Sequence, residues 1–379
     1  MSALSETSSL REGVSDGRVL KEANMNYILE FEKLDKNSLP IVGGKNASLG
    51  EMIKADIRVP PGFAVTTDSY LIFITEAGIK DRILEIVSAL DPDDVAALNK
   101  ASADVQEMIK KTAMPEAVIG AIEDGYLQLC HKCAVEAIPV AVRSSATAED
   151  LPNASFAGQQ DTYLWIQGAD QVVTHVQNCW ASLYTPRAIA YRIKNDFPHE
   201  KVLISVGVQK MVNSRAAGVM FTINPTNGDI SKLVIEGSWG LGETVVSGSV
   251  NPDKFVVDKV MLEINERTVS TKHIECVYDL EQGEVVNADV DENMQCTCCL
   301  ADEEIKALVS AGKNIENHYG RPMDIEWAID KDISFPENVF IVQARPETVW
   351  SQRKTESVLG KKTGRQLLME QAMKRIKIP

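Results

Sequence analysis

The sequence predicts an α+β protein with two lobes, a helix-rich N-terminal lobe followed by a C-terminal lobe of antiparallel sheet. Up to about residue 200, apolar residues recur every three to four positions, the spacing of amphipathic helices. From about Lys201 the apolar period becomes two, which is typical of half-buried strands. Because the two patterns are segregated along the chain, a doubly wound parallel sheet is disfavoured.

Length and composition place the chain among ordinary globular proteins. Its 379 residues predict two or three domains or lobes, at roughly 100–200 residues per domain. Hydrophobic residues make up 44% and charged residues 25%, which excludes disordered and fibrous classes. The expected order is a mobile tail over 1–24, a helix-rich part over 25–200, a sheet-rich lobe over 201–349 and a basic linker or docking segment over 350–379.

The same spacing predicts the individual elements. In the N-terminal part we expect helices at Ala47–Ala55, Ser69–Glu76, Lys80–Leu90, Val95–Lys111, Pro115–Glu136 and Ala169–Lys194, with strands at Gly62–Thr66, Pro139–Arg143 and Asp161–Gln167. In the C-terminal part, alternation predicts strands at Val202–Val212, Ala217–Ile223, Lys232–Gly237, Lys254–Val260, Asp324–Asp330 and Val339–Arg345. One helix is expected between them, Glu303–Tyr319, ended by Gly320.

The charge balance limits the classes of partner. Lys and Arg number 39 against 54 Asp and Glu, and the net charge of -15 repels nucleic acid and anionic membrane surfaces. Apolar runs fall far short of the roughly 20 residues of a membrane span. The first 24 residues lack the apolar centre of a secretion signal. We therefore expect a cytoplasmic protein that binds neither nucleic acid nor membrane.

Seven cysteines, an odd number without a secretion signal, favour reduced thiols over a disulfide framework. Cys130 and Cys133 form one local cluster, and Cys296, Cys298 and Cys299 form another. Neither repeats a two-residue spacing on a turn as zinc sites do. Buried, unreactive thiols are the favoured interpretation, with zinc the weaker alternative.

Two cations stand where phosphate could bind. Lys45 follows two glycines before a helical stretch, and helix N-termini attract anions. Arg143 ends a predicted strand, and its planar guanidinium suits phosphate oxygens. The alternatives are a plain glycine turn at Lys45 and an ion pair between Arg143 and the nearby Glu149 or Asp150.

A third group of polar residues lies on two alternating strands. Asp324 and Glu326 share one face of the first strand, and Gln343 and Arg345 share one face of the second. A hairpin would bring all four side by side. Glu326 and Gln343 suit a magnesium ion that completes its shell with water and phosphate oxygens, and Arg345 could meet a terminal phosphate. The alternative is an edge hairpin with an Asp–Arg surface pair.

Other catalytic motifs find little support. The glycine-rich segment 237–242 could cover a nucleotide as a flap, but the spacing fits neither a Rossmann nor a P-loop motif. None of the five histidines stands in a recognisable nucleophile–base setting.

The motifs together resemble the nucleotide-binding region of the phosphoenolpyruvate synthase and pyruvate phosphate dikinase family, over about residues 25–350. The segments that carry the resemblance are GGKNASLGEM from Gly43, VPPGFAVTTDSY from Val59, AVRSSATAEDLPNASFAGQQDTYL from Ala141, VQKMV from Val208, GVMFTINP from Gly218, EGSWGLGETVVSG from Glu236, DIEWAI from Asp324 and VQARPET from Val342. The resemblance implies an ATP-grasp-type fold that binds ATP and Mg²⁺.

The resemblance also implies roles for single residues. Lys45, Arg143 and Arg345 match phosphate-contacting cations, and Asp324 matches a catalytic-site acid. Residues matching the magnesium site are Glu326 and Gln343, and those matching the adenine-reading hinge are Gln209, Lys210, Met211 and Val212.

Relatives in this family also carry a swivelling domain with a phosphate-accepting histidine and a barrel that binds pyruvate, and this sequence has neither. We therefore expect a catalytic subunit that cleaves Mg-ATP to AMP and phosphate and passes the β-phosphoryl group to a histidine on a partner subunit or domain. The separate ATP-binding subunit of phenylphosphate synthase is the most similar architecture, with phenol as final acceptor. The alternatives are an N-terminal ATP-binding piece of a pyruvate-utilising phosphoenolpyruvate synthase and a non-catalytic ATP-binding regulatory module.

Overall fold

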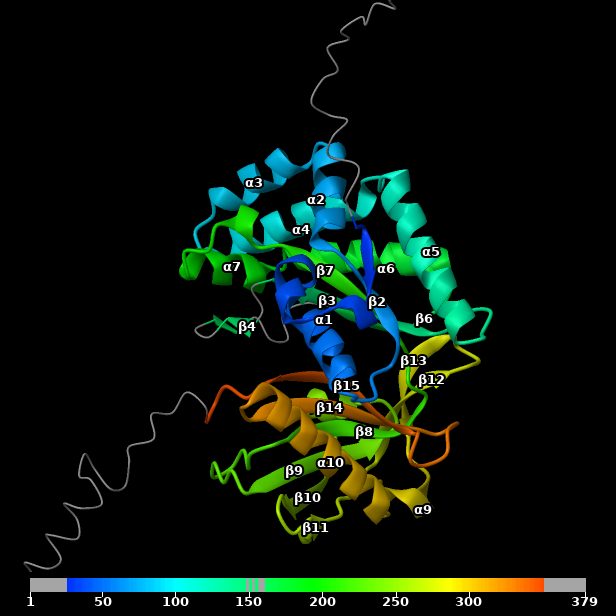
Figure 1. Ribbon diagram of the computed structural model, residues 1–379. Coiled ribbons are helices and arrows are strands. Elements are labelled where there is room, and N and C mark those ends of the chain that lie inside the picture. The colour runs from blue at the N-terminus through cyan, green and yellow to red at the C-terminus, as the bar shows by residue number, and fades with distance from the viewer. Residues whose placement is uncertain (1–25, 148–149, 152–153, 156–160, 351–379) are drawn as a thin grey trace, which may run out of the picture.

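The computed structural model describes residues 26–147, 150–151, 154–155 and 161–350 (Figure 1). The tail expected over 1–24, and all of the basic end except Trp350, lie outside the described residues. Within them, no helix is both long enough and apolar enough to cross a membrane.

The first sheet has five antiparallel strands in the order β1-β2-β7-β3-β6. The strands are β1 (Ile28–Glu30), β2 (Gly62–Val65), β3 (Val140–Ala146), β6 (Thr162–Ile166) and β7 (Ile204–Lys210). Most helices pack against this sheet in one large apolar core (Figure 1). They are α2 (Thr67–Glu76), α3 (Lys80–Ser88), α4 (Val95–Lys111), α5 (Glu116–Lys132), α6 (Ala169–Ser182) and α7 (Pro186–Lys194).

The second sheet has six antiparallel strands in the order β11-β10-β9-β8-β14-β15. They are β8 (Ser214–Phe221), β9 (Lys232–Trp239), β10 (Asp253–Asp258), β11 (Ile264–Thr268), β14 (Met323–Asp330) and β15 (Val339–Pro346). Helix α10 (Asp302–Tyr319) buries Ile305, Leu308 and Ile315 in the core it shares with this sheet. It ends at Gly320, whose φ of 66° is the left-handed cap that glycine adopts without strain.

Helix α1 (Leu39–Lys54) lies between the two sheets and packs against β3, β7 and β15 (Figure 1). A hairpin of β12 (Ile274–Asp279) and β13 (Glu284–Asp289) contacts β6 of the first sheet and β9 of the second (Figure 1). The remaining short elements are β4 (Asp150–Leu151), β5 (Ala154–Ser155), α8 (Glu243–Val246), α9 (Glu292–Gln295) and the 3-10 turns Phe31–Lys33, Lys36–Ser38 and His199–Lys201.

The α+β architecture expected from the sequence is confirmed, but two local expectations about helices are corrected. The helix expected over Ala169–Lys194 is two helices, because Thr185 caps a new helix that starts with Pro186. Helix α1 begins eight residues earlier than expected and is interrupted at Gly43. Strand β7 pairs between β2 and β3, so the chain leaves the first sheet only after Lys210; the division at residue 200 stays a prediction about domains.

Candidate nucleotide site between the two sheets

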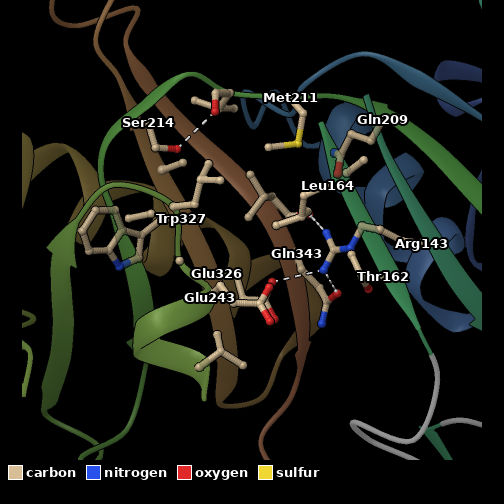
Figure 2. A pocket seen from close by; sticks show the side chains of 18 of the residues that line it. Arg143, Thr162, Leu164, Gln209, Met211, Ser214, Glu243, Glu326, Trp327 and Gln343 are labelled. Atoms are coloured by element: carbon tan, nitrogen blue, oxygen red, sulfur yellow. Dashed lines mark hydrogen bonds and ion pairs between the residues drawn. The ribbon is translucent and has the colours of Figure 1, made fainter. Parts of the chain in front are cut away.

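A pocket of about 920 Å³ opens between the two sheets (Figure 2). Nine of the ten site residues expected from the sequence line it, namely Lys45, Arg143, Gln209, Lys210, Met211, Val212, Glu326, Gln343 and Arg345. The tenth, Asp324, pairs in register with Arg345 at its edge. Segments far apart in the sequence therefore converge on one site.

The β14–β15 hairpin expected from the alternation of polar residues is confirmed. Asp324 stands opposite Arg345, and Glu326 stands opposite Gln343. A bulge follows Glu326, after which Trp327 pairs with Ile341. Cross-strand pairing thus places a carboxylate oxygen and an amide oxygen next to each other on the pocket wall.

Arg143 joins the two sheets across the pocket. From β3 its guanidinium donates to Gln343 Oε1 at 2.6 Å, to Glu326 Oε2 at 3.1 Å and to the carbonyl of Val342 at 3.2 Å (Figure 2). The Arg143 side chain is 18% exposed, so the pair with Glu326 is shielded from solvent far better than a surface ion pair. The cation expected for phosphate binding therefore also contacts both expected magnesium ligands.

Lys45 is positioned by the interruption in α1. Gly43 has φ 71° and ψ 172°, and a Cβ there would lie 2.2 Å from the carbonyl oxygen of Ser145. Ser145 Oγ donates to the carbonyl of Val42 and accepts from the N–H of Asn46, which ties the interruption to β3. Lys45 Nζ then reaches the carbonyl of Ser144 at 3.0 Å. The expected Gly-Gly-Lys helix start is thus present as a break inside a longer helix.

Asp324, on the β14–β15 hairpin, has a carboxyl group whose pKa is raised. Burial raises its pKa to about 6, because the desolvation of the carboxylate outweighs the attraction of Arg345. Arg345 Nε lies 3.6 Å from Asp324 Oδ2, and Oδ1 is buried without a hydrogen-bond partner among the described residues. Such a carboxyl group can take up or release a proton near neutral pH.

The opposite end of the pocket is apolar. Met211 is buried and packs with Ala141 and Leu241, while the half-buried Leu164 adds to the same cluster. Figure 2 shows Met211 and Gln209 at a distance from Glu326 and Gln343. This end offers a flat base an apolar slot, and the other end offers charged and polar groups.

Several residues line the pocket that were not predicted from the sequence. Ser214 lines the pocket and belongs to none of the motifs, and Glu243 lies in the motif from Glu236 but was given no role. Leu164 had a partial signal, since alternation placed it on one strand face with Thr162. The expected glycine-rich flap over 237–242 was a better clue, because Leu241 and Gly242 belong to it and line the pocket.

The oxygen donors fit a magnesium ion better than a softer metal. Glu326 and Gln343 supply hard oxygen atoms, which Mg²⁺ prefers, and the open pocket leaves room for water and phosphate oxygens. Among the described residues, this site included, no group of three or more His, Cys, Asp or Glu side chains could hold a metal. Arg143 forms an ion pair, but its partner is Glu326. The pair with Glu149 or Asp150, the alternative expected from the sequence, involves side chains outside the described residues.

Comparisons with known proteins identify the family of this chain. The family "Pyruvate phosphate dikinase, AMP/ATP-binding domain" matches residues 39–366. A probable phosphoenolpyruvate synthase of Staphylothermus marinus is 49% identical over 89% of this chain and 43% of its own length. A probable phosphoenolpyruvate synthase of Methanocaldococcus jannaschii is 49% identical over 89% of this chain and 28% of its own length. The phosphoenolpyruvate synthase of Aeropyrum pernix is 45% identical over 87% of this chain and 43% of its own length. This chain therefore spans less than half of each of these relatives.

Proposed function

Since the chain belongs to the pyruvate phosphate dikinase AMP/ATP-binding domain family, we propose that it is the ATP-binding part of a phosphoenolpyruvate synthase. Its α+β fold is the two-lobed ATP-grasp type expected from the sequence. The names of the relatives support a pyruvate-utilising enzyme over the preferred expectation of phenylphosphate synthase, and no relative named here is a phenylphosphate synthase. Pyruvate is therefore the proposed final acceptor, in place of phenol.

The single observation that carries the proposal is the polarity of the pocket. One end is apolar and bordered by Gln209–Val212, and the other gathers Lys45, Arg143 and Arg345 beside Glu326. We place the adenine at the apolar end, against Met211, and the triphosphate along the three cations. Each charge-assisted hydrogen bond to a phosphate contributes about 1.5–3 kcal/mol, enough together to hold a triphosphate in an acidic protein.

The proposed reaction converts ATP, water and a histidine of a partner domain into AMP, phosphate and phosphohistidine. In such transfers the protein contributes mainly position and charge stabilisation. Lys45 and Arg345 hold the phosphate oxygens, and Asp324 Oδ1 is placed to accept a proton. Magnesium, held by Glu326 and Gln343, would neutralise phosphate charge.

The test uses the purified chain with Mg-ATP labelled at the β-phosphorus, alone and with the histidine-bearing remainder of a phosphoenolpyruvate synthase relative. We expect AMP and an acid-labile labelled partner, followed by label transfer to pyruvate when pyruvate is added. Lys45→Ala should abolish AMP formation without unfolding the protein. Transfer to phenol alone would restore the first expectation, and tight ATP binding without AMP would identify a regulatory module.

A further inference from the structure

Behind the apolar end of the pocket, an aromatic contact joins the first sheet to the β12–β13 hairpin. Trp165 of β6 stacks on Tyr278 of β12, with ring centroids 4.9 Å apart and planes 14° apart. Trp165 belongs to the first sheet, and Tyr278 belongs to the hairpin that follows β11 of the second. Neither side chain lines the pocket, so both act from behind its wall.

The backbone of β6 is distorted at the point where this stack forms. Between its pairs with Val140 and Val142, β6 carries one extra residue, so Leu164 and Trp165 together oppose Ala141. Trp165 has φ 61°, a left-handed conformation that is strained for a bulky side chain. A bulge of this kind changes the direction of a side chain. Here it leaves Leu164 on the pocket wall while Trp165 turns to the hairpin.

The hairpin also holds the facing part of the wall. Leu241, which lines the pocket, donates its N–H to the carbonyl of Cys276 at 2.7 Å. Gly240 approaches so closely that a Cβ there would lie 2.3 Å from the same carbonyl oxygen. Cys276 and Tyr278 lie two positions apart on one face of β12. The hairpin thus supports Leu241 through the backbone of Cys276 and supports Leu164 through the Trp165–Tyr278 stack.

We propose that the Trp165–Tyr278 stack is a positioning pair for the base of the nucleotide, which sets the spacing of Leu164 and Leu241 across the apolar slot. This inference rests on the proposed function, since it assumes that a base enters this slot. A strained tryptophan persists only where surrounding contacts hold it. The stack supplies such a contact, and it acts on the base end of the pocket while leaving the cationic end untouched.

The test compares ligands that carry a base and a triphosphate with a ligand that carries the triphosphate alone. The full chain and its variants are titrated calorimetrically with Mg-ATP, Mg-GTP and magnesium tripolyphosphate. Tyr278→Ala should weaken Mg-ATP by about three- to tenfold, the range that corresponds to one aromatic pair, while tripolyphosphate affinity stays unchanged. The preference for ATP over GTP should fall as well. Tyr278→Phe keeps the stack and should bind like the wild type.

Two further variants keep the test decisive. Leu280→Ala, on the same hairpin but 88% exposed, is the matched control and should change nothing. Trp165→Gly suits the left-handed backbone, so it should fold normally yet lose base affinity as Tyr278→Ala does. Equal losses for Mg-ATP and tripolyphosphate, or unchanged Mg-ATP binding in both stack variants, would overturn the inference. If the wild type bound tripolyphosphate but showed no added affinity for any nucleotide, the proposed function itself would fail.

Discussion

At the scale of single residues, Arg143 can bind either the oxygens of Glu326 and Gln343 or the phosphate of a nucleotide. It donates to Glu326 and Gln343, whose oxygens we assign to magnesium, and it is itself assigned to phosphate. A cation already bound to these oxygens competes with any metal. Phosphate that draws Arg143 away would therefore free the ligands for the ion, so that nucleotide and metal bind more tightly together than separately.

Arg143→Ala should accordingly raise the affinity of the nucleotide-free protein for Mn²⁺, used as a spectroscopic substitute for Mg²⁺, by about five- to tenfold. The same variant should weaken ATP binding, because it removes a phosphate contact. Electron paramagnetic resonance of free Mn²⁺ measures the first effect. Arg58→Ala, an exposed arginine outside the pocket lining, is the control. Unchanged Mn²⁺ affinity in Arg143→Ala would place the metal on other oxygens.

The raised pKa of Asp324 predicts how the stability of the protein depends on pH. Burial raises its folded pKa from 3.8 to about 6, so the folded state binds the proton more tightly than the unfolded state does. The stabilisation from the neutral acid is complete below about pH 4 and is lost as the pH rises through 6. Asp324→Asn should therefore stabilise the protein at pH 8, by on the order of 2 kcal/mol, and give little difference near pH 4.

Urea denaturation of both proteins at the two pH values checks this sign. Asp289→Asn, at an exposed site on β13, serves as the matched control and should not alter the pH dependence. A variant that lost stability at pH 8 would contradict the burial argument. The same substitution should abolish AMP formation, since Asp324 is proposed to handle a proton.

At the scale of elements, the break in α1 is the feature most sensitive to substitution. Gly43→Ala combines a left-handed backbone with a clash against the Ser145 carbonyl. We expect a loss of about 2 kcal/mol or more in the free energy of unfolding, together with weaker ATP binding as Lys45 moves. Gly78→Ala has a similar φ of 69° but nothing within 4 Å, so its smaller loss isolates the strain from the clash. Equal losses in both variants would show that the contact with β3 contributes nothing.

The elements that the sequence predicted well are those with a buried face. The strands 323–330 and 339–346 alternate strongly, and α10 carries a regular apolar stripe, so their bounds and pairing followed from pattern alone. Strand β11 is largely exposed and has no alternation to detect. The hairpin of β12 and β13 was missed for a related reason, since most of its side chains are only partly buried.

The site was predictable as a set of residues but not as a set of contacts. Lys45, Arg143 and Glu326 were found by motif and by resemblance. The bond between Arg143 and Glu326 joins residues 183 positions apart, and no local pattern carries such a distance. The Trp165 bulge was likewise hidden, because regular alternation placed Trp165 on the face opposite Leu164 without showing that it turns to a hairpin.

At the scale of the whole molecule, the pocket belongs to both sheets at once. Arg143 reaches from β3 to β15, and Ser48 of α1 donates to the carbonyl of Ala344 at 2.7 Å. Residues of both sheets line the pocket, so we expect a ligand that fills it to contact both lobes. Binding should therefore slow hydrogen exchange of backbone amides in both sheets.

Mg-ATP should slow amide hydrogen exchange in Gln209–Val212 on one side and in the residues 342–345 on the other, with no change in the distant helix α4. Hydrogen-exchange mass spectrometry with and without Mg-ATP measures this. Protection limited to one side would mean that the nucleotide does not bridge the sheets. Lys45→Ala should reduce the protection on both sides together.

The place of β7 also decides how this chain can be divided. Strand β7 is the central strand of the first sheet and comes after residue 200. A fragment that ended at residue 200 would lack β7 and would leave β2 and β3 with unpaired edges. Exposed edges of that kind pair with other chains and aggregate. Anyone wishing to express the halves separately, or to rejoin them as a split reporter, would cut in the connection 211–213, where the first sheet is complete and the second has not begun.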